Sequence, residues 1–168
     1  MRKPFLETLT KLAEKDPKII LIIGDVGFRF VEDYKERFPK QFVNVGVLEQ
    51  SMMGIAAGMA RMGWKPYVYT MRNFIAFRPY EQVRNDIAFG NANVKLFGVS
   101  GSAAYKFLGF SHNVIRDESG NEPKQDDEDV AMFKRLPNMN LHQAETEEEC
   151  AKLIEQEYER TGPAYFII

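Results

Sequence analysis

The sequence is short of the residues and patterns that mark several classes of protein. Its 168 residues include one cysteine, Cys150, so an internal disulfide and a cysteine-rich metal site are both excluded. The two histidines, His112 and His142, lack the spacing of a metal-binding pair, so we expect no metal ion held by this chain. No apolar run is long enough to span a membrane, and Glu7 comes too early for the apolar core of a signal peptide. These features predict a soluble protein of the reducing cytoplasm.

A strong charge of either sign is also missing. Lys and Arg number 22 against 24 Asp and Glu, which gives a formal net charge of -2. Because nucleic-acid and acidic-membrane binders carry a basic surface, we expect neither partner. Hydrophobic residues make up 45% of the chain, enough for a sizeable core at this length. With no linker or internal repeat, the sequence predicts one domain over residues 1–168.

Several ligand and catalytic motifs are absent. The chain has neither the Gly-x-Gly-x-x-Gly of dinucleotide sites nor the phosphate-cradling loop of nucleoside triphosphate sites. The run from Gly98 to Ser102 comes close to the nucleophile elbow of serine hydrolases but lacks its closing glycine. A serine hydrolase is therefore disfavoured.

Helical and strand patterns alternate along the whole chain. Helical spacing of apolar residues begins at Phe5, Leu9 and Leu12, and a continuous apolar run follows at once. Strands that are apolar throughout are typical of a parallel sheet covered on both faces. We therefore predict a doubly wound α/β domain, with a mostly parallel six-stranded sheet and helices on both faces. The expected strands are 18–23, 42–45, 65–70, 94–100, 138–142 and 164–168, and the later helices are 48–62, 73–89, 130–135 and 147–160.

The last helix has the clearest start signal. Thr146 can cap its first turn, and Glu149 stands three residues later, as in a capping box. Gly162 and Pro163 end the helical pattern.

An acidic segment over residues 116–129 interrupts the alternation. It contains Ser119-Gly120-Asn121 and Pro123 among seven acids, and it has no apolar residue before Val130. This composition favours an inserted, solvated surface loop. The alternative is a lid beside a ligand cleft or a partner contact.

Glu49 stands out at the junction of an expected strand and an apolar helix. Ligands of doubly wound sheets gather beyond the carboxyl ends of the strands, where Glu49 is expected to lie. An acid in the first turn of a helix is also common for a structural reason, since it complements the helix dipole. From the residues alone, the two interpretations are equally favoured. Gly54 and Gly58 on the same helix allow close approach of another helix, either within the core or from a second subunit.

A series of short motifs extends from this junction over nearly the whole chain. The motifs are Phe38-Pro39, Phe42-Val43-Asn44-Val45-Gly46, Leu48-Glu49-Gln50, Met53-Gly54-Ile55-Ala56-Ala57-Gly58, Gly63-Trp64-Lys65-Pro66, Asn73-Phe74, Tyr80-Glu81-Gln82-Val83-Arg84 and Leu136-Pro137-Asn138-Met139. In this order and spacing the sequence resembles the pyrimidine-binding domain of the transketolase family of thiamine diphosphate enzymes. Each motif is weak alone, and the combination is specific.

The resemblance implies a cofactor site built around Glu49. The matching glutamate of the family hydrogen-bonds a ring nitrogen of the aminopyrimidine and favours the tautomer whose imino group removes a proton from the thiazolium carbon. Met71, Phe74 and Phe77 fall where the family places the apolar pocket for that ring, although their spacing also suits a helix that buries a core face. Asp25 is assigned to the same cofactor-binding edge.

The resemblance also suggests a residue that faces the substrate. His112 matches a family histidine that can polarise a carbonyl or move a proton near neutral pH. Around it the sequence departs from the family's sugar-phosphate enzymes: Leu108 replaces an acidic residue, Ser100 lies near the place of another histidine, and His142 near that of a phosphate-binding arginine. Ordinary pentose phosphates are therefore not the expected substrates.

The family's separate diphosphate-binding domain is not part of this sequence. That domain carries Gly-Asp-Gly and a downstream Asn, whereas here Gly24-Asp25 continues as Val26-Gly27. We therefore expect a split enzyme, in which a large subunit holds the diphosphate and Mg2+ and a heterotetramer or dimer forms. The expected reaction is transfer of a two-carbon unit to an aldehyde acceptor, with a small carbonyl or sugar substrate. A decarboxylase, a synthase or a non-catalytic binding subunit are the alternatives.

Overall fold

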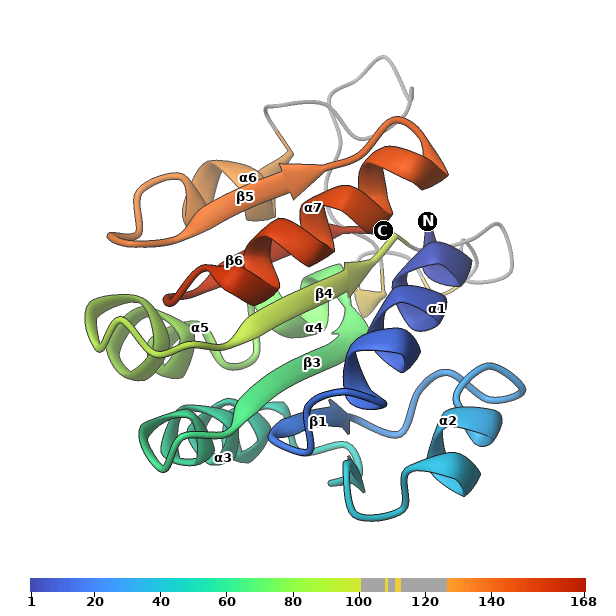
Figure 1. Ribbon diagram of the computed structural model, residues 1–168. Helices are drawn as coiled ribbons and strands as arrows, with labels where there is room; N and C mark the ends of the chain where they lie inside the picture. Colours follow the sequence, from blue (N-terminus) through green and yellow to red (C-terminus); the bar gives the residue numbers. More distant parts are fainter. Residues whose placement is uncertain (101–107, 109–110, 113–126) are drawn as a thin grey trace.

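The structure, a computed structural model, describes residues 1–100, 108, 111–112 and 127–168 (Figure 1). Six strands form one sheet in the order β2-β1-β3-β4-β6-β5, and every neighbouring pair is parallel. The predicted doubly wound α/β fold is confirmed, and each predicted strand is found within two residues of its expected ends. The strands are β1 (Ile19–Ile23), β2 (Phe42–Asn44), β3 (Lys65–Met71), β4 (Lys95–Val99), β5 (Asn140–Gln143) and β6 (Ala164–Ile167).

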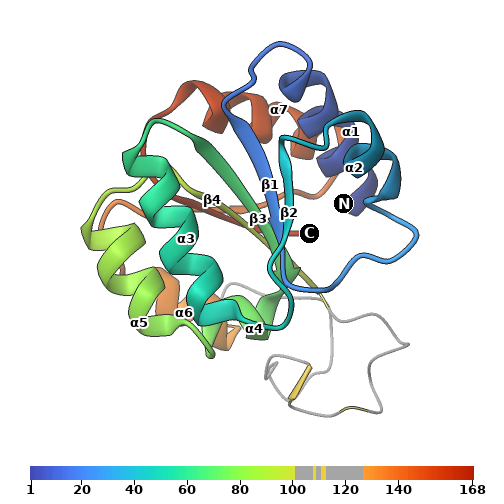
Figure 2. The same cartoon turned by 90° about the horizontal axis from the view of Figure 1, so that it is seen from below.

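Helices cover both faces of the sheet and enclose two apolar cores (Figure 2). Alternate residues of β1 divide between these cores: Ile20 and Ile22 join one, while Ile19, Leu21 and Ile23 join the other. The first core lies under α3 (Glu49–Arg61), α4 (Arg72–Ala76), the π-helical segment η1 (Val83–Phe89) and α6 (Glu128–Phe133). The second lies under α1 (Arg2–Ala13), α2 (Glu32–Arg37) and α7 (Glu147–Glu159).

The predicted helix over 73–89 is wrong as a single element. It is divided into α4, a short α5 (Tyr80–Gln82) and η1, with Phe77, Arg78 and Pro79 between the first two. Proline has no backbone N–H to donate, and it disfavours helical backbone at the residue before it. The apolar spacing that suggested one helix persists across the break, because Ile75 and Val83 face the same core.

The prediction of a solvated acidic loop over 116–129 is wrong at its carboxyl end. Asp127 and Asp129 are buried, and Asp127 stands at the N-cap of α6, which begins two residues before the predicted start at Val130. Burial is possible here because the cation of Arg72 lies between the two carboxylates. Residues 116–126 lie outside the described part of the chain.

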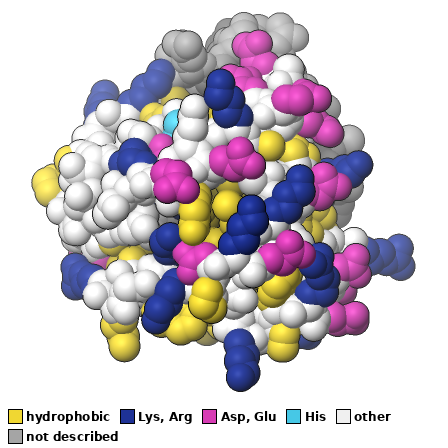
Figure 3. Space-filling view, in the orientation of Figure 1, with side chains coloured by type: hydrophobic (Ala, Val, Ile, Leu, Met, Phe, Trp, Pro, Cys, Tyr) yellow, Lys and Arg dark blue, Asp and Glu magenta, His cyan; other side chains and the backbone are white. Residues whose placement is uncertain are grey.

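The surface over α1 and α7 mixes both signs of charge, with Lys and Arg interspersed among Asp and Glu (Figure 3). Within the described ranges, no helix combines the length and the apolar character needed to cross a bilayer.

Candidate functional site

The predicted site residues follow the carboxyl ends of neighbouring strands. Asp25 comes after β1, Glu49 after β2, Met71 ends β3, and His112 follows β4. Because all strands are parallel, these ends meet along one edge of the sheet. The fold thus collects residues from distant parts of the sequence at the edge where doubly wound sheets bind ligands.

Glu49 is the first residue of α3 and is only 4% exposed. The N-cap residue, Leu48, makes no side-chain capping hydrogen bond. The Glu49 carboxylate is the negative charge in the first turn of α3, where the helix dipole favours it. The carboxylate Oε1 accepts a hydrogen bond from Nη1 of Arg78 at 2.6 Å. Burial of this acid is therefore compensated by a cation and by the helix dipole.

Arg78 links Glu49 to the aromatic part of the site. Its guanidinium carbon lies 3.6 Å from the centroid of the Phe74 ring, in cation–π contact. The His112 ring meets Phe74 edge-on, with 5.0 Å between the ring centroids. Glu49, Arg78, Phe74 and His112 thus form one continuous chain of contacts.

His112 is held from two directions. Its Nδ1 lies 2.7 Å from the Ser111 hydroxyl oxygen. The Asn73 amide donates a hydrogen bond to the Ser111 carbonyl oxygen and so ties this segment to α4. The structure therefore places His112 beside Phe74 although 38 residues separate the two in sequence.

The other predicted site residues lie around this chain. Met71 is the N-cap of α4 and is buried, whereas Phe77, at the other end of α4, is 38% exposed. Asp25 is exposed and exchanges hydrogen bonds with Asn44: its backbone N–H donates to Asn44 Oδ1, and its carboxylate accepts from Nδ2. Phe77 is therefore partly open to solvent, and Asp25 is held beside Asn44.

A small cavity of about 120 Å³ adjoins Asp25 rather than Glu49. Its lining includes Asn44, Glu32 and Lys35, and none of Glu49, Phe74 and His112 belongs to it. This hollow is much smaller than typical small-molecule pockets. The Glu49 contact chain is therefore not part of this cavity.

Sequence reasoning missed a buried ionic network directly behind α4. Arg72 donates through Nε and Nη2 to both oxygens of Asp129 and through Nη2 to Asp127. Tyr165 of β6 donates to Asp129 at 2.5 Å. Gly98 of β4 makes room for this packing, since a Cβ there would lie 2.6 Å from the Tyr165 hydroxyl. The network fixes the start of α4, and the glycine of the incomplete nucleophile elbow has a packing role.

A metal site of the usual kind is not formed by the described residues, in which no three His, Cys, Asp or Glu side chains are placed to hold an ion. His142 lies away from the edge described above. Its Nε2 pairs with Oε1 of Glu157 at 2.8 Å. It is part of a structural cluster at the other end of the sheet.

Comparison with known proteins identifies the family. The family described as the transketolase pyrimidine binding domain matches residues 1–121. The chain belongs to this family. Members of the transketolase family use thiamine diphosphate.

Individual relatives agree with this assignment. One of the subunits of the apulose-4-phosphate transketolase of Phocaeicola vulgatus is 36% identical over 141 residues, or 83% of this chain and 41% of that protein. The 1-deoxy-D-xylulose-5-phosphate synthase of Bacillus mycoides is 33% identical over 150 residues, covering 88% of this chain and 21% of that protein. Among solved structures, a split-gene transketolase described as an inactive beta4 tetramer has a TM-score of 0.82 and 29% identity. It is matched over 99% of this chain and 50% of its own. The chain thus spans half or less of these relatives.

The residues of the edge fit the aminopyrimidine half of thiamine diphosphate. An aminopyrimidine needs an aromatic or apolar surface and a carboxylate at a ring nitrogen. Phe74 and Met71 supply apolar surface, and Glu49 supplies the carboxylate. Within the described part of the chain, Arg78 is the hydrogen-bond partner of the Glu49 carboxylate and contacts Oε1 alone. Among these described residues, Oε2 has no hydrogen-bond partner.

Proposed function

We propose that this chain is the pyrimidine-binding part of a transketolase-like enzyme that transfers a two-carbon ketol unit to an aldehyde acceptor. The observation that supports this most strongly is the buried Glu49 at the carboxyl ends of the strands, which accepts a hydrogen bond from Arg78 through Oε1. The cofactor, when bound, supplies the carbanion chemistry, and the protein orients and tunes it.

Each residue of the site then has a defined task. Glu49 would hold a proton between Oε2 and the ring nitrogen of the aminopyrimidine. Phe74 and Met71 would exclude water from the ring and fix its plane. His112, held by Ser111 and in contact with Phe74, would place an imidazole nitrogen against the substrate carbonyl.

The diphosphate and Mg2+ would be held by a partner subunit, in a dimer or a heterotetramer. Within the described residues no side-chain cluster suited to a metal ion is formed. The Phocaeicola relative is named as one subunit of its transketolase, and the split-gene neighbour is described as an inactive tetramer. Both descriptions are consistent with a division of the catalytic machinery between two chains.

A synthase of related type is the second candidate. The 33% identity to a 1-deoxy-D-xylulose-5-phosphate synthase favours it, because that match covers 88% of this chain. Both candidates use the same cofactor site and differ in the donor and acceptor. The two are separated by assaying the reconstituted complex with ketose or 2-oxo acid donors and aldehyde acceptors. Release of CO2 identifies the synthase type. Ketol transfer without release of CO2 identifies the transketolase type.

The test of the proposal is calorimetric titration of thiamine diphosphate and Mg2+ into this chain alone and into its complex with the large subunit. We expect binding and turnover only in the complex. Glu49→Gln should lower kcat at least 100-fold with assembly intact, whereas Glu81→Gln, an exposed acid on α5, should leave it unchanged. Tight binding to the isolated chain would disprove the division between subunits. Full activity of Glu49→Gln would show that the carboxylate is not used.

A further inference from the structure

Arg78 is the residue through which the two central members of the site are joined. Its Nη1 donates to Glu49 Oε1, and the same guanidinium covers the Phe74 ring. Neither the motifs of the sequence nor the relatives' names give it a function. A single side chain therefore controls both the carboxylate rotamer and one face of the aromatic ring.

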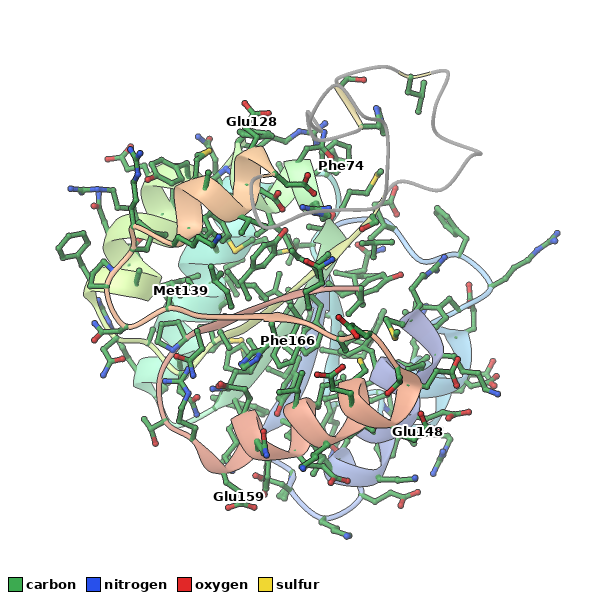
Figure 4. All side chains as sticks on the ribbon, turned by 90° about the horizontal axis from the view of Figure 1, so that it is seen from above. Phe74, Glu128, Met139, Glu148, Glu159 and Phe166 are labelled. Carbon is green, nitrogen blue, oxygen red and sulfur yellow. The ribbon has the colours of Figure 1, made fainter. Side chains whose placement is uncertain are left out.

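The position of Arg78 in the chain explains how it reaches both. It lies between the end of α4 at Ala76 and the start of α5 at Tyr80, directly before Pro79. The helix break frees Arg78 from the regular helical direction, so its side chain can turn back over Phe74 toward α3. Figure 4 shows Phe74 of α4 on the side of the molecule that also carries Glu128, away from Glu148 and Glu159 of α7.

The ion pair is asymmetric in its exposure. The Glu49 side chain is 4% exposed, whereas the Arg78 side chain is 39% exposed. The carboxylate thus belongs to the protein interior and the cation approaches it from the open side. Arg78 donates its hydrogen bond to Oε1, and among the described residues Oε2 has no protein partner of its own.

We propose that Arg78 is a positioning residue: it fixes Glu49 through Oε1 so that Oε2 meets the pyrimidine ring nitrogen, and it fixes the plane of Phe74. This inference rests on the proposed function, since it concerns the same cofactor site. Without the cation, the buried carboxylate can rotate, and rotation moves Oε2 away from the ring nitrogen.

The test uses the complex of this chain with the large subunit, loaded with thiamine diphosphate and Mg2+. The first readout is the exchange of the thiazolium C2 hydrogen for deuterium, followed by NMR after an acid quench. The second is the dissociation constant of the cofactor, measured by calorimetry. Arg78→Met keeps an apolar stem over Phe74 and removes the charge, and Arg78→Lys restores a cation without the planar group.

A matched control is available in Arg84. Its guanidinium also covers an aromatic ring, with 4.8 Å to the Phe89 centroid, but it hydrogen-bonds Asn85 rather than a carboxylate. We expect Arg78→Met to slow the exchange at saturating cofactor at least tenfold and to raise the dissociation constant less, about threefold. Arg78→Lys should recover most of the exchange rate, and Arg84→Met should match the wild type.

The outcomes separate the two proposals. An exchange rate in Arg78→Met equal to that of Arg84→Met would overturn the role of Arg78 and leave the proposed function standing. A wild-type complex that binds no cofactor would overturn both. If Arg78→Met fails to assemble, Arg78→Gln takes its place: an exchange slower than in Arg78→Lys in an intact complex supports positioning, and an exchange equal to that of Arg84→Met overturns it.

Discussion

Two buried carboxylates at opposite edges of the sheet are treated differently by this fold. Glu49, beyond the carboxyl ends of the strands, has one hydrogen-bonded cation whose side chain is 39% exposed. Glu157, on α7 near the amino ends of β4 and β5, pairs with Lys95, and these two side chains are 4% and 3% exposed. The Glu49–Arg78 pair is therefore partly exposed to solvent, whereas the Glu157–Lys95 pair is buried, and we call the latter the closed cluster.

The closed cluster is saturated with hydrogen bonds. Oε1 of Glu157 accepts from Asn140 and His142, and Oε2 accepts from Lys95 and Arg160. Burial alone would raise the pKa of Glu157, but these donors and the charge of Lys95 lower it to about 2. For the amine the balance is reversed, since burial outweighs the attraction of Glu157 and lowers the pKa of Lys95 to about 8. Both oxygens of Glu157 are thus hydrogen-bonded, whereas among the described residues only Oε1 of Glu49 has a hydrogen-bond partner.

The largest expected effect comes from removing the charge of the closed cluster. Glu157→Gln leaves Lys95 buried without its counter-ion, so we expect the free energy of unfolding to fall by about 3 kcal/mol. Glu49→Gln should change it by less than about 1 kcal/mol, because the side chain of Arg78 can return to water. Urea denaturation of both variants measures the difference. Equal losses would mean that both pairs are structural.

A second substitution tests whether the hydrogen bonding of a buried carboxylate or its position along the strands decides its contribution to stability. Asp129 lies at the same edge as Glu49 but resembles Glu157: it is fully buried, and both of its oxygens accept hydrogen bonds from Arg72 or Tyr165. Asp129→Asn should therefore lower the free energy of unfolding by about 2 kcal/mol, somewhat less than Glu157→Gln because Asp127 still faces Arg72. Urea denaturation again gives the value. A loss as small as that of Glu49→Gln would show that position along the strands, rather than saturation, decides the contribution.

The pH dependence of stability tests the closed cluster without a large perturbation. The folded pKa of Glu157, about 2, is below its ordinary value of 4.5, so the folded state binds fewer protons between these values. Its contribution is present above pH 4.5 and is lost as the pH falls toward 2. We expect wild type to lose on the order of 1–2 kcal/mol more than Glu157→Gln over this window, after allowance for solvent screening. Parallel curves for the two proteins would contradict the assignment.

The sheet could be predicted from the sequence because its strands are apolar throughout. A run such as Ile19 to Ile23 can be buried only between two layers, and each run therefore indicates its own place in a parallel sheet. The break at Pro79 was missed since the apolar period continues across it. A proline inside a helical pattern is itself a warning of such a break.

The candidate site could be predicted only in part. Glu49, Phe74 and His112 were proposed from the family resemblance, and the fold brings them into one chain of contacts. Arg78 and the partners of Arg72 were missed because an ion pair between distant residues leaves no periodic signal. The acidic segment concealed Asp127 and Asp129 for the same reason, since composition indicates solvation unless the buried cation is known.

The smallest expected effect concerns the starts of the two long helices on either side of the sheet. The predicted cap of α7 is confirmed: Thr146 accepts from the Glu149 N–H at 3.1 Å, and the Glu149 carboxylate accepts from the Glu145 N–H.

At α3, Leu48 offers no such side chain, and Glu49 is the acid in the first turn. Thr146→Ala should lower the free energy of unfolding by about 1 kcal/mol. It should leave the exchange of the cofactor's C2 hydrogen unchanged, because α7 lies away from the site. Thermal and urea unfolding, measured beside the C2 exchange of the complex, test both halves of this expectation. We therefore expect the cap of α7 to affect stability alone, whereas the amino end of α3 acts on the Glu49 carboxylate through the helix dipole. A slower exchange of the C2 hydrogen in Thr146→Ala would contradict this separation.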